Sequence, residues 1–153
     1  MQPPLFHDEL PYREVKDGDP LARNLVDKHY SRRWRGKPGT ALTLGPGWKM
    51  VLLGVAADWV FGWRKTLYRL DGQKGVECAY FHNESRALSS SLILACEAAW
   101  DERHGATRKF TYVHPAFVRS RIPGYCFLKA GWVRDEGYVS PRGLIRYFKE
   151  VAG

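Results

Sequence analysis

Two adjacent side chains of this sequence, His29 and Tyr30, are of types that perform acid–base chemistry. They follow a segment with helical spacing and precede a run of cations. An imidazole and a phenol in such a place could act as a general base, a proton donor or metal ligands. A structural alternative also fits, because an imidazole at the end of a helix can pair with the terminal carbonyl groups while the tyrosine is partly buried. The residues alone leave both interpretations open.

Tyr125 and His114 are two further candidates. Tyr125 opens a short segment, 125–130, that is predicted to be helical because Pro123-Gly124 precedes it and Gly131 follows it. It could donate a proton, or it could pack the helix against a sheet. His114 follows the alternating strand-like segment 110–113, and a structural histidine with satisfied hydrogen bonds explains it as well as a functional one.

A polar turn precedes the longest predicted helix. It comprises Asn83, Glu84, Ser85 and Arg86. Backbone amides at the start of a helix attract anions, and Arg86 would add a charge-assisted contact. Asn83 or Ser85 could instead be the N-cap, which requires no ligand, and both interpretations can hold for one turn. We expect Asn83, Ser85, Arg86 and Ser90 to bind the cofactor or group donor.

Positive charge is concentrated in two predicted loops. The chain carries 24 Lys and Arg against 16 Asp and Glu, a net charge of +8, which suits an anionic partner such as nucleic acid. A merely soluble basic protein is the alternative. Arginines usually form a solvated surface, but two arginine-bearing loops beside the candidate site favour contacts with DNA phosphates. The predicted DNA-binding residues, with Trp34 stacking on or inserting between bases, are Ser31, Arg32, Arg33, Trp34, Arg35, Lys37, Arg119 and Arg121.

The expected secondary structure brings these candidates together. Residues 1–18 are predicted to be an extended arm, and Asp19 and Pro20 to cap and begin a helix that ends near residue 30. The remaining predicted elements are a hairpin of strands 49–56 and 59–65, a central strand 76–82, a helix 86–103, the strand 110–113, the helix 125–130 and a last strand 144–148. The fold class that follows is α/β, with a mixed central sheet flanked by helices and a right-handed parallel crossover over 76–114. A splayed parallel pair with a helix N-terminus beneath it is a natural ligand site.

The sequence also predicts details of the hairpin, the core and the long helix. Gly54 and Gly62 indicate bulges or close approaches of the backbone within the hairpin. The tryptophans Trp59, Trp63 and Trp100 are expected in the core. The residues of the long helix whose spacing predicts a face toward the sheet are Leu88, Leu92, Ala95, Cys96, Ala99 and Trp100.

Length and composition set the outer limits of the interpretation. At 153 residues and 44% hydrophobic, the chain is expected to form a single domain over residues 1–153. No apolar run reaches the roughly 18 residues of a membrane span, and no secretory signal is visible, so we expect a cytoplasmic protein. The three widely spaced cysteines include no C-x-x-C pair, which argues against a disulfide framework or a cysteine zinc site.

Several short segments of the chain form a recognisable set. The order of elements resembles the GNAT-type acyltransferase superfamily, and Gly124 to Trp132 is similar to its Y-x-x-x-G-F ending. The further segments are His29-Tyr30-Ser31-Arg32, Gly75-Val76-Glu77-Cys78, Phe81-x-Asn83-Glu84-Ser85, Phe110-Thr111-Tyr112-Val113 and Arg119-Ser120-Arg121-x-Pro123-Gly124-Tyr125-Cys126-Phe127. Together, over about residues 19–148, they resemble the Mom family of phage DNA-modification proteins.

The resemblance implies a GNAT-like fold and a specific reaction. It implies conversion of adenine N6 in double-stranded DNA to a carbamoylmethyl-type (acetamido) derivative, which protects phage DNA from restriction in the host cytoplasm. It implies catalytic roles for His29, Tyr30, Tyr125 and His114, and iron bound by His29 and Tyr125. Because N6 is a conjugated amine inside the base stack, such an enzyme must flip the base out and accept a proton as N6 attacks.

The chain departs from these families at two places. The usual GNAT pyrophosphate loop, a Q/R-x-x-G-x-G/A run before the long helix, is not recognisable, and residues 83–88 stand there instead. Binding of acetyl-CoA is therefore in doubt, and the donor is unknown. His114-Pro115 also stands where related Mom-like sequences often have Asp-Pro.

Two other functions fit the sequence less well. One is a GNAT-like N-acyltransferase that uses acetyl-CoA on a small amine or a protein, with the positive charge incidental. The other is a non-catalytic DNA-binding protein on a GNAT-like scaffold. Tight binding of acetyl-CoA would favour the first, and DNA affinity without modified nucleosides would favour the second.

Overall fold

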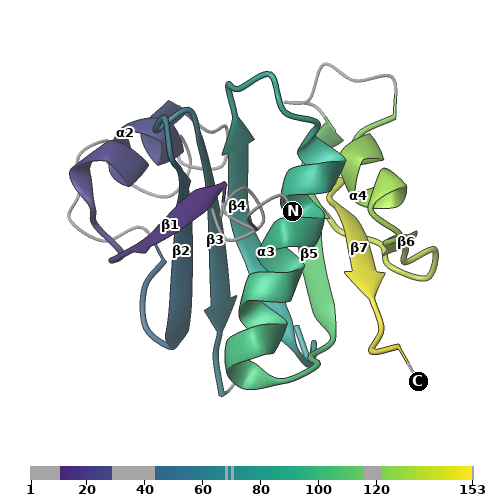
Figure 1. Ribbon diagram of the computed structural model, residues 1–153. Helices are drawn as coiled ribbons and strands as arrows, with labels where there is room; N and C mark the ends of the chain where they lie inside the picture. The colour runs from purple at the N-terminus through teal and green to yellow at the C-terminus, as the bar shows by residue number, and fades with distance from the viewer. Residues whose placement is uncertain (1–10, 29–43, 68, 70, 116–121, 153) are drawn as a thin grey trace, which may run out of the picture.

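A seven-stranded mixed sheet forms the centre of the computed structural model, which describes residues 11–28, 44–67, 69, 71–115 and 122–152 (Figure 1). The elements are β1 Tyr12–Val15, α2 Pro20–Lys28, β2 Trp48–Gly54, β3 Trp59–Lys65, β4 Val76–Asn83, α3 Ser89–His104, β5 Lys109–Val113, α4 Tyr125–Lys129, β6 Val133–Arg134 and β7 Ile145–Lys149. The strand order is β1-β2-β3-β4-β5-β7-β6. The α/β class with a mixed sheet is confirmed, and β4 is the central strand, as predicted. No helix of the described part is both long and apolar enough to cross a bilayer.

The N-terminal region contributes a strand to the sheet, although we predicted an arm over residues 1–18. Residues 12–15 are extended but pair antiparallel with β2, for example Tyr12 with Gly54. The proline-punctuated, mixed-charge sequence hid this strand, because an edge strand needs no continuous apolar run. The predicted start of α2 is confirmed: Asp19 Oδ1 accepts hydrogen bonds from the amides of Leu21 (3.0 Å) and Ala22 (3.1 Å).

The hairpin of β2 and β3 is confirmed, and aromatic rings pack directly on its two glycines. The register shifts between Gly62 and Trp63, which marks a bulge. The ring of Tyr80 on β4 covers Gly62, and a Cβ placed there would lie 2.5 Å from the ring carbon Cζ. Gly54 is likewise covered by the indole of Trp59. Both glycines therefore allow an aromatic ring to lie directly on the backbone.

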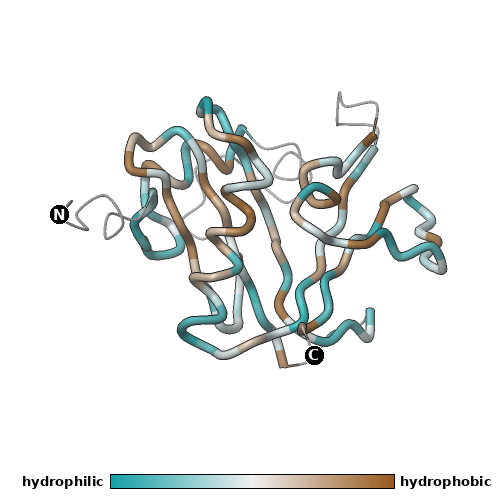
Figure 2. The backbone as a smooth tube through the Cα atoms, turned by 45° about the vertical axis from the view of Figure 1, so that its right-hand side comes forward, coloured by the Kyte–Doolittle hydropathy of each residue, from teal (hydrophilic) through white to brown (hydrophobic). Residues whose placement is uncertain are grey.

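Helices cover the sheet on opposite faces. Residues of α3 and α4 pack with Trp63 and Trp132 in one core, whereas α2 packs on Val60 and Tyr80 in a second core. The split follows from alternation along β2, because Met50 and Leu52 belong to the first core and Val51 and Leu53 to the second. Figure 2 shows the hydrophobic residues running along these inner strands.

Three tryptophans of the first core donate hydrogen bonds inside it. The indole N–H groups of Trp63, Trp100 and Trp132 bond to Cys96 O (3.0 Å), Thr107 Oγ1 (3.1 Å) and Glu97 Oε2 (2.9 Å). The predicted burial of Trp59, Trp63 and Trp100 is confirmed. Because each buried N–H has a partner, these rings contribute apolar area without an unsatisfied donor.

The long helix α3 begins later than predicted, at Ser89 rather than Arg86. Leu88 has an extended backbone (ψ 127°) and is 72% exposed, so its predicted place on the inner face is wrong. The buried residues include Ile93, which the predicted face omitted. The predicted end is confirmed, since Gly105 with φ 82° follows His104.

Strands β4 and β5 run parallel, as the predicted crossover requires, but they pair only briefly. Their register joins Val76 to Lys109 and ends with Cys78 opposite Thr111. Beyond this point β4 continues to Asn83 along β3, while β5 continues to Val113 along β7. The two strands therefore diverge toward their carboxyl ends.

We predict that Gly62→Ala destabilises the fold by about 1–3 kcal/mol, because the new methyl group displaces the Tyr80 ring from a packed core. Gly137→Ala is the matched control, since the nearest atom to its added Cβ, Asp135 Oδ1, is 3.7 Å away. Urea denaturation monitored by tryptophan fluorescence measures both variants. Equal midpoints for the two variants would contradict the packing argument.

Candidate functional site

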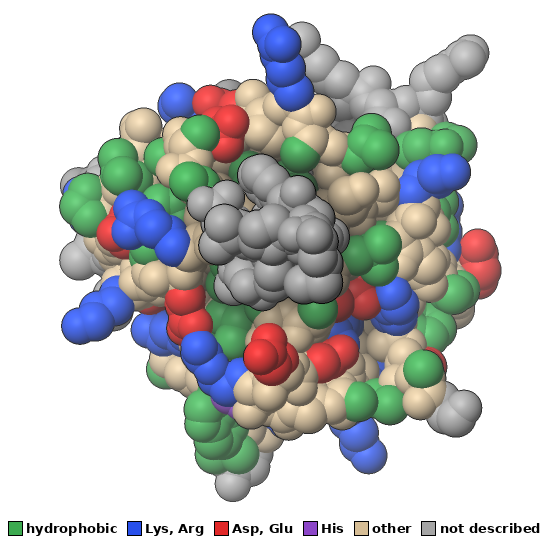
Figure 3. Space-filling model, in the orientation of Figure 1, with side chains coloured by type: hydrophobic (Ala, Val, Ile, Leu, Met, Phe, Trp, Pro, Cys, Tyr) green, Lys and Arg blue, Asp and Glu red, His purple; other side chains and the backbone are tan. Residues whose placement is uncertain are grey.

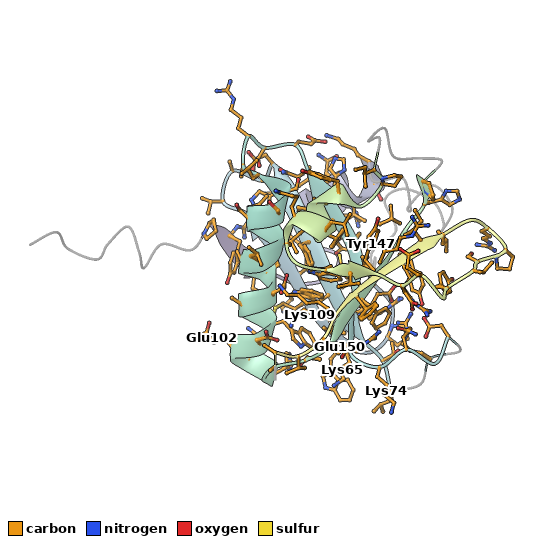
Figure 4. The ribbon with its side chains drawn as sticks, turned by 90° about the vertical axis from the view of Figure 1, so that its right-hand side faces the viewer. Lys65, Lys74, Glu102, Lys109, Tyr147 and Glu150 are labelled. Atoms are coloured by element: carbon orange, nitrogen blue, oxygen red, sulfur yellow. The ribbon has the colours of Figure 1, made fainter. Side chains whose placement is uncertain are left out.

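The carboxyl ends of β4 and β5 define one edge of the sheet, at the top of Figure 1. Asn83 ends β4, and the chain returns through residues 84–88 to the start of α3. His114 follows directly on β5. The opposite edge carries different residues, and Figure 4 shows Lys65, Lys74, Lys109 and Glu150 there. The predicted donor turn and His114 thus follow the two strands that diverge.

The side chain of Asn83 organises the polar turn. Its Oδ1 accepts hydrogen bonds from the amide (2.9 Å) and hydroxyl (2.6 Å) of Ser85. Its Nδ2 donates to Ala87 O and to Ser89 Oγ, both at 3.0 Å. The prediction that Asn83 or Ser85 is the N-cap of α3 is wrong, because Leu88 occupies that position and provides no side-chain cap. Asn83 shapes the turn from within instead.

Arg86 and Ser90 were predicted to bind the donor together with Asn83 and Ser85. Arg86 is exposed, and its side chain makes no hydrogen bond or ion pair with the described part of the chain. Ser90 lies half-buried in the first turn of α3. An exposed guanidinium just ahead of a helix start that lacks a side-chain cap is an arrangement that favours an anion.

A histidine–carboxylate pair lies at the same edge and was not among the predicted site residues. His82 Nε2 is 2.8 Å from Glu84 Oε2, and Lys28 Nζ at the end of α2 is 3.5 Å from the same oxygen. The hydrogen bond from His82 is the largest influence and lowers the pKa of Glu84. Desolvation opposes it, and the charge of Lys28 lowers the pKa further. The spacing His-x-Glu at the end of a strand was the available signal, because alternate residues of a strand point to the same face.

The contact between Lys28 and Glu84 also relates two distant parts of the sequence. Lys28 ends α2 and is the last described residue before position 44. The predicted residues that lie outside the described ones are His29, Tyr30, Ser31, Arg32, Arg33, Trp34, Arg35, Lys37, Arg119 and Arg121. The segment with most of them follows directly on a residue that contacts the polar turn.

Tyr125 is the first residue of α4 and is 48% exposed. About half of its surface is therefore accessible, whereas Phe127, 6% exposed, is the residue of α4 that packs in the core. Gly124, with φ 81°, lies against the ring of Tyr147, whose hydroxyl donates to Pro123 O. Figure 4 shows Tyr147 near the middle of the molecule. The turn into α4 is thus fixed by β7, and it leaves the Tyr125 side chain accessible.

Positive and negative side chains are interspersed on the described surface, as Figure 3 illustrates for one face. Many cations of the described residues are engaged in ion pairs: Lys49 with Asp17, Arg64 and Arg69 with Glu77, Arg103 with Glu14, Arg108 with Glu150, the buried Lys109 with Asp101, Arg146 with Asp135 and Lys149 with Glu97. By contrast, residues 29–43 and 116–121 contain arginines and lysine but no Asp or Glu. The positive excess of the chain therefore belongs largely to these two segments.

Comparisons with known proteins identify no relative: no family model, no curated protein and no solved structure matches the chain. Among the described residues, no group of three or more His, Cys, Asp or Glu side chains is placed to hold a metal ion. An open hollow on the surface is lined by residues 13–19, between β1 and α2, and includes none of the candidate residues. Its lining is a short charged turn, so we base the site on the diverging strands.

We predict that Asn83→Ala destabilises the protein by about 1–2 kcal/mol, because it removes hydrogen bonds that hold the turn between β4 and α3. Arg86→Ala in the same turn should change stability by less than about 0.5 kcal/mol, because the side chain is exposed. Thermal and urea denaturation measure both. A stable Asn83→Ala protein would show that the turn does not depend on this amide.

Proposed function

We propose that this protein is a transferase that converts the N6 amino group of adenine in double-stranded DNA to a carbamoylmethyl-type (acetamido) derivative, and thereby protects phage DNA from host restriction. The observation that supports the proposal most is the contact of Lys28 with Glu84. It brings the end of α2, from which the cationic segment continues, to the turn predicted to bind the group donor. Lys28, the last described residue before the cationic segment, thus contacts the turn predicted to bind the donor.

The proposal includes a GNAT-like arrangement of the sheet. Its support is the β4–α3–β5 unit, whose parallel strands pair only from Val76 to Cys78 and from Lys109 to Thr111 before they diverge. Diverging strands with a helix start beside them give a ligand access to backbone groups that would otherwise be paired. The donor would lie at the turn that begins with Asn83, with Arg86 as its charged contact.

The proposed chemistry assigns roles to the remaining candidates. Adenine N6 must leave the base stack and lose a proton as it attacks the donor. His29 acts as base or ligand, Tyr30 and Tyr125 orient or protonate groups, and His114 supplements them in place of the family aspartate. The exposure of Tyr125 supports its availability. Iron, which the resemblance also implies, finds no ligand set among the described residues, and the proposal routes no step through it.

The first test is the nucleoside composition of DNA from expressing cells. We expect mass spectrometry to detect a modified deoxyadenosine in cells with the wild-type protein and a loss of at least about 100-fold with His29→Ala, the range expected when an acid–base group is removed. His104→Ala, an exposed histidine at the far end of α3, is the control and should keep full modification. Unmodified adenine in the wild-type sample would refute the proposal.

The second test concerns DNA affinity. Replacing Arg32, Arg33 and Arg35 with alanine should lower the slope of the logarithm of the association constant against the logarithm of salt concentration by about three, since each phosphate contact contributes about 0.9. Fluorescence anisotropy with a labelled duplex measures it. The control is the double substitution of Arg134 and Arg142, which are exposed elsewhere. Equal slopes for both variants would place the DNA contacts outside the predicted loop.

An N-acyltransferase that uses acetyl-CoA is the second candidate, and one observation favours it. The N-cap residue of α3, Leu88, has no side-chain acceptor for the first helical amides. A phosphate of coenzyme A could accept those hydrogen bonds instead. Two results together would favour this candidate: binding of acetyl-CoA measured by calorimetry, and unmodified DNA in cells that express the protein.

A further inference from the structure

We infer that Leu88, the residue directly before helix α3, inserts into the base stack of double-stranded DNA and fills the space that the flipped adenine leaves. The inference rests on the proposed function and makes it more specific, because it names the side chain that keeps the target base out of the duplex. Extruding a base costs stacking and pairing energy. Apolar side chains, leucine among them, enter base steps in proteins that distort DNA.

Leu88 occupies the N-cap position of α3, where a leucine side chain contributes nothing to the helix. Its backbone is extended, with φ −65° and ψ 127°, and its carbonyl accepts a hydrogen bond from the Leu92 amide at 3.1 Å, as an N-cap residue requires. Ser, Thr, Asp or Asn with this backbone geometry would accept hydrogen bonds from amides of the first turn. The sequence therefore forgoes helix stabilisation at this residue.

The core gives Leu88 little compensation for the missing cap. The residue is 72% exposed, and the two residues before it, Arg86 and Ala87, are exposed as well. A single exposed leucine is common on protein surfaces and carries little information by itself. Leu88 differs because it stands where a polar residue would stabilise the fold. An apolar side chain that provides neither a cap nor buried area is available to a partner.

Asn83 holds both neighbours of Leu88 in place. Its Nδ2 donates to Ala87 O and to Ser89 Oγ, both at 3.0 Å. The amide of Ala87 also donates to Ser85 Oγ at 3.2 Å. A side chain carried by a turn that is fixed in this way loses little conformational freedom on binding, and this lowers the cost of insertion.

Positive charge around Leu88 favours DNA as the partner. Arg86 is exposed two residues earlier in the same turn. Lys28, which directly precedes the cationic segment 29–43, lies 3.5 Å from Glu84 of this turn. Cations attract the phosphates, and an apolar side chain between them can reach the bases. Leu88 also lies at the edge where β4 and β5 diverge, which is where the proposed site would receive the extruded base.

Fluorescence anisotropy with two labelled duplexes tests the inference. One duplex is intact, and the other has a stable abasic site in place of one adenine, so that the space is open before the protein binds. We expect the wild-type protein to bind the abasic duplex about tenfold more tightly, the order expected for burying one leucine side chain. Leu88→Ala should bind both duplexes equally. The wild-type ratio should not change with salt, because the contact is apolar, whereas both affinities fall.

Leu67→Ala is the matched control for the loss of an exposed leucine. Leu67 is 75% exposed and follows Lys65, which Figure 4 shows at the opposite edge of the sheet. This variant should keep the wild-type preference for the abasic duplex. Leu88→Met, which retains an apolar side chain of similar volume, should keep it as well.

Leu88→Asn separates insertion into DNA from folding. Asparagine suits the N-cap geometry, so we expect the melting temperature to rise by about 2–4 °C while the preference for the abasic duplex is lost. A residue with a purely structural role would not combine a gain in stability with a loss in binding. Circular dichroism melting curves and the same anisotropy assay measure the two effects.

The outcomes distinguish a failure of the inference from a failure of the proposed function. A wild-type protein without preference, an unchanged preference in Leu88→Ala, or an equal loss in Leu67→Ala overturns the inference. Modified deoxyadenosine in expressing cells then leaves the proposed function intact. A wild-type protein that binds neither duplex and leaves cellular DNA unmodified overturns the proposed function, and the inference with it.

Discussion

The divergence of β4 and β5 is the constraint on which the candidate site depends. Their last paired residues are Cys78 and Thr111, and the Thr111 hydroxyl donates to the Cys78 carbonyl at 2.8 Å in the buried interior. The hydroxyl supplies this hydrogen bond just where the parallel ladder ends. The buried carbonyl of Cys78 therefore keeps a donor and carries no free-energy penalty for an unsatisfied acceptor. From that point each strand follows its antiparallel neighbour. The edge opens because the two neighbours lead the strands apart.

Helix α3 also contacts the C-terminal part of the chain and fixes its position. Its buried Glu97 accepts from Trp132 Nε1 at 2.9 Å and pairs with Lys149 of β7 at 2.8 Å, and Lys149 also donates to Ala130 O. Buried ion pairs add little net stability compared with apolar packing, but losing one partner is costly. The network therefore specifies where α4 ends relative to α3 and β7. The accessible position of Tyr125 follows from this fixed frame.

Local patterns predicted most of the fold. Alternation and β-branched content indicated β2 to β5, and Asp19-Pro20 and Gly105 marked helix ends through capping physics. The errors occurred where tertiary contacts decide. β1 exists because β2 offers it an edge, and α3 begins late because Asn83 holds residues 85–89 in a turn that competes with the helix. The pair of His82 and Glu84 escaped prediction because it combines the end of a strand with the turn that follows.

The distribution of charge gives the strongest physical reason to look for an anionic partner. Within the described body, salt bridges such as those of Arg64 and Arg69 with Glu77 neutralise cations and hold strands and loops together. Charge placed only for solubility would be spread over that body, with both signs interspersed. Here, instead, the segments 29–43 and 116–121 hold arginines and lysine without any acidic residue. Charge concentrated in this way costs repulsion, and binding to phosphates would offset that cost by releasing counterions.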